Sequence, residues 1–170
     1  MRTFVHSLFL FLVFVLAAGC HHEIVDRAPM TAPLSSFKTV NVQFDAASFT
    51  KADVDKDDRE YFRTRLDHRM SRGLGLTQVD AGAASDLSVR IKVNDYGRTN
   101  RGRDVELLLT AELYDNNRRA TAGSFDVNIN SRKVDDEDDP IDRKLDKGPT
   151  QKAIDHAAIK IVEHIKNPKS

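Results

Sequence analysis

The chain has 170 residues, and its 26 basic and 26 acidic side chains give a formal net charge of zero at pH 7. A neutral chain of this length suits one domain with a modest core and offers no overall basic excess for binding nucleic acid. Cys20 is the only cysteine, which excludes a disulfide within the chain.

The N-terminal residues follow the three-part plan of a secretory signal peptide. Arg2 supplies a positive charge, an apolar run extends to Leu16, and three small residues precede Cys20. A membrane-spanning helix needs roughly 20 apolar residues, and this run is shorter and is interrupted at His6. We therefore predict that residues 1–19 form a signal peptide and not a permanent transmembrane helix.

The motif Leu-Ala-Ala-Gly-Cys at residues 16–20 resembles the lipobox of bacterial lipoproteins. The resemblance implies that the thiol of Cys20 receives diacylglycerol, that the signal is cut before this residue, and that the new amine is acylated. Three acyl chains make an effectively permanent anchor, because each buried methylene contributes about 0.8 kcal/mol. In this family an Asp after the cysteine often retains the protein in the inner membrane. Since His21 stands there, we expect anchoring on the periplasmic face of the outer membrane. The competing interpretation is an ordinary signal peptide whose cysteine is incidental.

Residues 20–36 contain Pro, Thr and Ser with little periodicity, which predicts a flexible tether. At about 3.4 Å per residue, such a tether could hold the domain several tens of ångströms from the membrane. A single domain is then expected over residues 37–167.

Beyond the tether, alternation of apolar and polar residues predicts four strands, and a spacing of about four residues predicts two helices. The predicted elements are a strand at residues 40–44, a helix at 57–72, strands at 87–93, 105–113 and 125–129, and a helix between Pro149 and Pro168. Between the last two strands, Asn116 and Asn117 tolerate the positive φ of a tight hairpin turn. The last three strands are therefore expected to pair as a meander.

The order β-α-β-β-β-α predicts an α+β fold, a two-layer sandwich with a mostly antiparallel sheet and two helices on one face. The other face should meet water, because its residues are polar: Ser88, Arg90, Lys92, Glu106, Thr110, Glu112, Asp126 and Asn128. The element order resembles that of small envelope lipoproteins with folds like the amino-terminal domain of TolB or the lipopolysaccharide-assembly protein LptE.

The sequence gives no pattern for catalysis or for metal binding, and we expect neither an enzyme nor a cofactor other than the lipid on Cys20. No Gly-x-Ser-x-Gly nucleophile motif occurs, and the only thiol is assigned to lipid. His21 and His22 are too close in sequence to converge on a metal. His156 and His164 lie about two helical turns apart, so they cannot share one ion, and we expect them to be surface or flank residues.

Two charged loops remain. Arg98, Arg101 and Arg103 lie among glycines and could clasp a phosphate or carboxylate, and the alternative is a solvated turn. A dense acidic run follows the last strand and lacks the ligand spacing of a calcium loop: Asp135, Asp136, Glu137, Asp138 and Asp139. In a meander the two loops lie at the same end of the sheet. They could pair within one molecule or between molecules, and the alternative for the acidic run is a solvated, mobile loop.

These observations favour a non-enzymatic outer-membrane lipoprotein that binds or assembles with another cell-envelope component. The expected partners are an envelope protein or a glycan, in addition to the membrane that holds the lipid. The alternative is a subunit of an envelope export apparatus. Such a subunit would either form a structural ring as a homo-oligomer or have an accessory role. Native mass separates these hypotheses.

Overall fold

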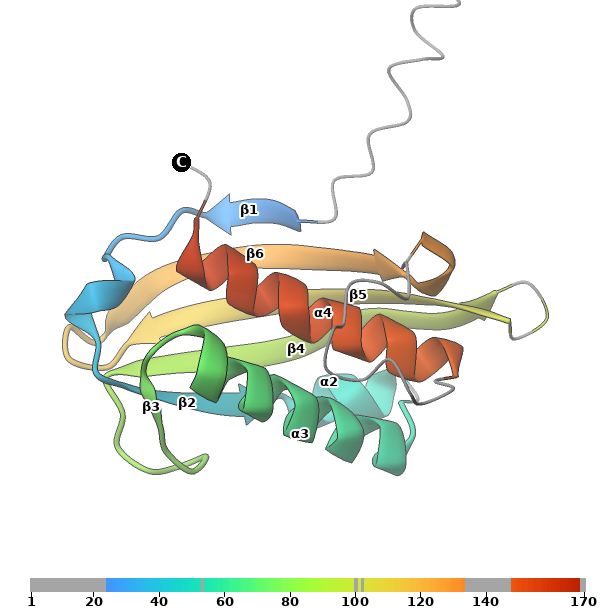
Figure 1. The fold of residues 1–170 in the computed structure, drawn as a ribbon, viewed down its shortest axis with the longest axis horizontal. Coiled ribbons are helices and arrows are strands. Elements are labelled where there is room, and N and C mark those ends of the chain that lie inside the picture. The colour runs from blue at the N-terminus through green and yellow to red at the C-terminus, as the bar shows by residue number, and fades with distance from the viewer. Residues whose placement is uncertain (1–23, 53, 100, 102, 134–147, 169–170) are drawn as a thin grey trace, which may run out of the picture.

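A computed structural model of the chain describes residues 24–52, 54–99, 101, 103–133 and 148–168. It contains one six-stranded sheet with two long helices on one face (Figure 1). The elements in chain order are β1 (Ile24–Ala28), the 3₁₀ turn η1 (Leu34–Ser36), β2 (Thr39–Phe44), α2 (Ala46–Lys51), α3 (Lys56–Gly73), β3 (Thr77–Gln78), β4 (Leu87–Thr99), β5 (Asp104–Asp115), β6 (Ala120–Asn130), the 3₁₀ turn η3 (Ser131–Lys133) and α4 (Pro149–Lys166).

The sheet has the strand order β1-β6-β5-β4-β2-β3. β4, β5 and β6 pair antiparallel as the predicted meander, and β1 adds to the far side of β6, also antiparallel. β2 pairs parallel with β4, because α3 lies in the crossover between these two strands. The predicted α+β class with a mostly antiparallel sheet is confirmed.

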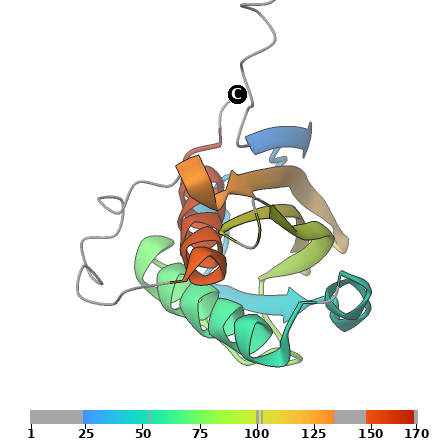
Figure 2. The ribbon, with the colours of Figure 1, turned by 90° about the vertical axis from the view of Figure 1, so that its right-hand side faces the viewer.

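The core lies between the sheet and the layer formed by α3 and α4, which pack side by side (Figure 2). The predicted helix positions supply it, with Phe62, Leu66 and Met70 from α3 and Ile154, Ala157, Ala158, Ile161 and Ile165 from α4 all buried. The two helices are also joined by Asp155, whose carboxylate accepts from Arg65 Nε at 2.5 Å and from the Tyr61 hydroxyl at 3.0 Å.

The short helix α2 follows β2 and lies apart from the α3–α4 layer (Figure 2). Asp45 begins it by accepting hydrogen bonds from the backbone N–H groups of Ala47 and Ser48. The Ser48 hydroxyl accepts a hydrogen bond from the backbone N–H of Val93 at 3.0 Å. It thereby provides a partner for a β4 backbone N–H that lies beyond the end of β2. Phe49 is buried against Phe44, with ring centroids 5.4 Å apart.

The prediction of a flexible tether is wrong for residues 24–36. Residues 24–28 form β1, and Ala32 is buried in the core. The sequence Ile-Val-Asp-Arg-Ala shows no alternation that would indicate a strand. Its pairing depends on partners about a hundred residues away, among them Asp126, which accepts from Arg27 Nε at 2.7 Å.

The expectation that His156 and His164 lie at the surface is also wrong, because both are buried. His164 Nε2 is hydrogen-bonded to Asp26 Oδ1 at 2.7 Å, and its ring packs on Phe125 with centroids 4.4 Å apart. The last turn of α4 therefore holds β1 from the core side of the sheet.

The hairpin between β5 and β6 is present, but its positive φ occurs at Arg119, not at either asparagine. The Asp115 carboxylate accepts from the backbone N–H groups of Asn117 and Arg118, each at 3.0 Å, and this bonding fixes the turn. The side-chain amide of Asn116 instead donates to the carbonyl of Ser85, just before β4, and to the hydroxyl of Ser88 on β4.

On the side of the sheet that faces away from α3 and α4, a chain of side-chain hydrogen bonds crosses the four strands β4, β5, β6 and β1. Asn94 Nδ2 donates to Thr110 Oγ1 at 2.6 Å, and the Thr110 hydroxyl donates to Asp126 Oδ1 at 2.6 Å. Asp126 also accepts from Arg27 of β1. Asp126 is thus the point at which the meander holds the edge strand.

We expect Asp126→Ala to destabilise the domain by about 1–2 kcal/mol, because it removes two hydrogen bonds, one of them to a charged group. Lys92→Ala is the control, since Lys92 is exposed on the same face and should change stability by less than about 0.5 kcal/mol. Urea unfolding of both variants measures the difference. Equal midpoints would show that Asp126 does not secure β1.

Candidate functional site

The face of the sheet opposite α3 and α4, here called the outer face, carries the polar residues that the alternation predicts. Arg90, Lys92, Glu106, Glu112 and Asn128 are exposed on it. Ser88 and Thr110 are instead buried, because neighbouring side chains bond to both of them. α3 and α4 cover the other face of the sheet and leave this one open (Figure 2).

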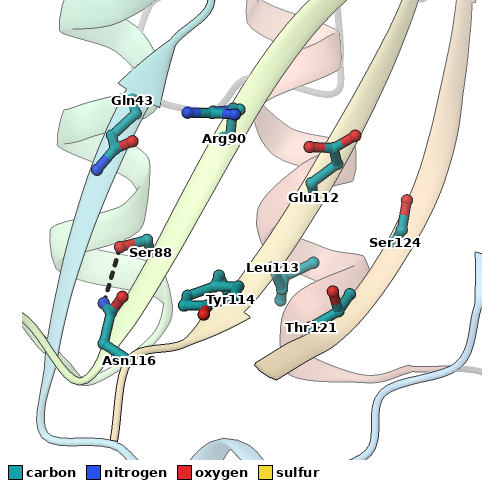
Figure 3. A pocket seen from close by; sticks show the side chains of 9 residues that line it. All are labelled: Gln43, Ser88, Arg90, Glu112, Leu113, Tyr114, Asn116, Thr121 and Ser124. Atoms are coloured by element: carbon teal, nitrogen blue, oxygen red, sulfur yellow. Dashed lines mark hydrogen bonds between the residues drawn. The ribbon is translucent and has the colours of Figure 1, made fainter. Parts of the chain in front are cut away.

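The outer face is hollowed at the end near the β5–β6 hairpin, in a groove of about 480 Å³ (Figure 3). Strand pairing builds it from rows of side chains that lie across the sheet. One row contains Gln43, Arg90, Glu112 and Ser124, from β2, β4, β5 and β6. The next row contains Ser88, Tyr114 and Thr121, and Asn116 closes the hairpin end.

Tyr114 is the aromatic side chain of this groove. Its side chain is exposed, and Tyr114 and Val25 are the two large hydrophobic residues exposed in the part of the chain that the structure describes. Tyr114 lies opposite Ser88 of β4 and Thr121 of β6, and the extra residue of the irregularity in this pairing is Ala122 of β6. Asn116 beside it is held in place, since its amide donates to Ser88 Oγ at 2.8 Å.

The groove has one positive and one negative side chain, Arg90 and Glu112, which lie directly opposite each other on β4 and β5. The other polar groups are amides and hydroxyls, and neither histidine nor cysteine lines it. This set can accept and donate hydrogen bonds and can pack a ring against Tyr114. It suits binding of a polar, uncharged surface.

Sequence reasoning identified Ser88, Arg90 and Glu112 as outward residues but did not single out Tyr114 or Gln43. A usable signal was present: both occupy outward positions in strands whose inward positions are aliphatic or aromatic. An aromatic residue in the outward phase, two residues before a hairpin turn, indicates an exposed ring. The hollow itself depends on the shape of the paired strands and has no sequence signal.

The structure separates Arg98 from the other two arginines. A bulge at residue 94 shifts the register of β4, so that Arg98 lies opposite inward-facing Val105. There it lines a second hollow with Asp55 and Tyr96. A hydrogen bond with Tyr96 raises the pKa of Arg98. Arg101 and Arg103 are exposed at the turn and do not line this hollow.

Two carboxylates at the start of α3, Asp55 and Asp58, interact electrostatically with Arg98. Burial raises the pKa of Asp58, the nearby Asp55 raises it further, and Arg98 lowers it. Arg98 therefore interacts with acidic groups of its own chain. An anion site shared by all three arginines, Arg98, Arg101 and Arg103, stays a prediction.

The acidic run Asp135–Asp139 and the lipidation residue Cys20 lie outside the described residues. The start of the segment that leads to the acidic run is described. Ser131 Oγ accepts from the backbone N–H of Val105 at 2.8 Å, so the chain leaves β6 beside the start of β5. This is the end of the sheet that carries the β4–β5 turn, as the meander predicts. Pairing between the basic and acidic loops stays a prediction.

Within the described ranges, no group of three or more His, Cys, Asp or Glu side chains could hold a metal ion. None of the helices in these ranges has the length and apolar character needed to cross a membrane.

Comparisons with known proteins give a fold likeness but no family. Neither the family models nor the curated proteins contain a match to this chain. Among solved structures it is similar to PelC from Paraburkholderia phytofirmans, which was solved as a dodecamer in two crystal forms. The first is 10% identical with a TM-score of 0.57 and covers 86% of this chain and 99% of PelC. The second is 9% identical with a TM-score of 0.56 and covers 86% and 98%.

A minor lipoprotein from Acinetobacter baumannii is 14% identical, covers 77% of this chain and 94% of that one, and has a TM-score of 0.39. Because this TM-score is too low to support an argument, the comparison of architecture depends on PelC. At this level of identity, the likeness to PelC shows a shared fold and nothing further.

Proposed function

We propose that this protein is a non-enzymatic lipoprotein of the cell envelope that binds another envelope component through the groove of its outer face. The observation that carries the proposal is the polar groove of about 480 Å³ on the face that α3 and α4 leave open. Its anchor is the lipid on Cys20, and its location is the periplasmic face of the outer membrane. These two assignments rest on the lipobox motif and on His21.

The chemistry of the groove supports a polar partner, either a protein surface or a glycan. Arg90 and Glu112 balance each other, so a strongly charged ligand gains little there. Tyr114 provides a ring of the kind that is enriched at protein interfaces, because it offers both apolar area and a hydroxyl. The side chains around it provide the hydrogen bonds that fix orientation.

Site-specific photo-crosslinking tests the proposal. With p-benzoylphenylalanine in place of Tyr114, irradiation of cells that naturally produce the protein should give a defined adduct. The control position is Glu60 on α3, whose side chain is 67% exposed and lies on the helix layer. It should give no such adduct. Identical products at both positions, or none at Tyr114, would contradict binding through the groove.

A second candidate function is that of a ring-forming structural subunit of an export apparatus. The observation that favours it is the likeness to PelC, a dodecamer whose chain is covered almost completely. Native mass spectrometry of the detergent-solubilised protein tests it. A closed homo-oligomer would support this candidate, and a Tyr114 adduct containing two copies of the chain would place the groove between subunits. A monomer at cellular concentration would exclude it.

A further inference from the structure

The docking of β1 brings the folded domain close to the proposed lipid anchor. Cys20 and Ile24 are four residues apart, and four extended residues span at most about 14 Å. Ile24 already belongs to β1, where it pairs with Val127 of β6. If Cys20 carries lipid, as proposed above, the start of β1 cannot leave the membrane by more than this span. The distance of several tens of ångströms predicted for a long tether is therefore excluded.

β1 and the residues after it are fixed to the domain from several sides. On the core side Asp26 bonds to buried His164 of α4, and on the outer face Arg27 pairs with Asp126. Beyond the strand, the backbone N–H of Thr31 donates to the carbonyl of Ala122 at 2.8 Å. The chain also packs tightly here, since a Cβ added at Gly123 would lie 3.3 Å from Met30 Cα. Extension of the tether would have to break all of these contacts.

β1 is also an edge strand, because it pairs with β6 and ends the sheet order. Natural edge strands are usually protected by charged residues. Val25 of this strand is 51% exposed and is one of the two large hydrophobic residues exposed in the described ranges. Because Val25 pairs with Asp126, its side chain lies on the outer-face side of the edge strand. Arg27, with 57% of its side chain exposed, lies two residues further on. An exposed apolar side chain beside a guanidinium, within about 18 Å of a lipid anchor, suits a phospholipid surface.

We infer that the lipid-anchored domain stands on its β1 edge and leans toward the outer face, so that Val25 contacts the phospholipid headgroup region of the bilayer. Val25 inserts its methyl groups at the boundary between headgroups and acyl chains, and Arg27 lies at the level of the phosphates. Because Arg27 already pairs with Asp126, the apolar contact of Val25 is the main attraction. The inference rests on the proposed lipidation of Cys20.

This orientation makes the sheet rise from the membrane in the order β1, β6, β5, β4, β2, β3. Strands are about 4.8 Å apart, so β3 lies roughly 24 Å further from the bilayer than β1. The groove, on β2, β4, β5 and β6, opens sideways, roughly parallel to the membrane plane. A partner bound there would be another component held near the same membrane surface.

Fluorescence quenching in membranes tests the orientation. The full-length lipidated protein is placed in nanodiscs of phosphatidylethanolamine and phosphatidylglycerol that contain nitroxide-labelled headgroups. A fluorophore is attached through Asn128→Cys on β6 or through Thr77→Cys on β3, both exposed positions. We expect the label at 128 to be quenched several-fold more than the label at 77, because β6 lies next to the membrane edge and β3 is the far edge of the sheet. Equal quenching, or stronger quenching at 77, overturns the inference.

A second pair of variants tests Val25 itself. Val25→Asp should lower the quenching ratio between positions 128 and 77, because a carboxylate resists entry into the headgroup boundary, while the short tether still keeps β6 nearer to the membrane than β3. Val25→Leu should keep the ratio. A ratio that Val25→Asp leaves unchanged overturns the contact.

The mass of the protein in the same samples separates this inference from the proposed function. A protein without lipid on Cys20 overturns the anchor and the orientation together. A lipidated protein with equal quenching overturns the orientation alone.

Discussion

Ile161→Asp is expected to prevent the domain from folding. Ile161 is fully buried on α4, which packs against β5, β6 and α3. Loss of the isoleucine side chain alone costs about 2–5 kcal/mol, and an unpaired carboxylate in the core adds several kcal/mol more. The sum is comparable to the whole stability of an ordinary domain, about 5–15 kcal/mol.

The matched control places the same residue on the exposed side of the same helix. Lys166 is exposed in the last turn of α4, so Lys166→Asp should cost no more than about 1 kcal/mol, from an unfavourable charge at the helix C-terminus. Circular dichroism and thermal unfolding of both variants measure the contrast. Similar melting temperatures would show that α4 does not cover the sheet as described.

Periodicity alone was enough to predict the elements that bury a complete apolar face. α3 and α4 repeat apolar residues every three or four positions, and β2, β4, β5 and β6 alternate regularly, so each carries its own evidence in its sequence. The order of these elements then fixes the two layers, because the apolar faces of two helices and one sheet have to cover each other.

The elements that could not be predicted derive their stability from distant partners. β1 depends on Asp126 and His164, and neither contact is visible in the local sequence around residue 26. α2 has only six residues and depends on the cap from Asp45 and on the burial of Phe49. Such short segments have no periodicity to read, and the prolines that follow β1, Pro29 and Pro33, indicate a linker.

The candidate site was predictable in composition and not in shape. Alternation places Arg90 and Glu112 on the outer face, and it would also place Tyr114 there. The bulge at residue 94 is the contrasting case. Arg98 was expected in a loop, but it lies on β4, and a single extra residue turns it to the side of Asp55. Periodicity gives no warning of such a shift, because a slip of one residue reverses every later side chain.

Cys20→Ser is expected to abolish membrane anchoring. The lipobox resemblance implies that only the thiol accepts diacylglycerol, and serine is unable to replace it, so the variant should stay an unprocessed precursor or enter the periplasm without lipid. The acyl chains supply the whole of the permanent anchor, since about 0.8 kcal/mol per buried methylene is lost with them. Contact through Val25 alone is far too weak to compensate. Detergent phase partition and the mass of the purified protein measure the loss.

His21→Asp is the matched control for Cys20→Ser, because it changes the next residue and leaves the thiol intact. It should keep the lipid and still partition into detergent. The same lipoprotein resemblance implies that it should move the protein from the outer to the inner membrane, which separation of the two membranes by density measures. Equal partition of wild type and Cys20→Ser into detergent would refute the lipobox assignment. A lipidated His21→Asp protein that stays in the outer membrane would refute only the role given to residue 21.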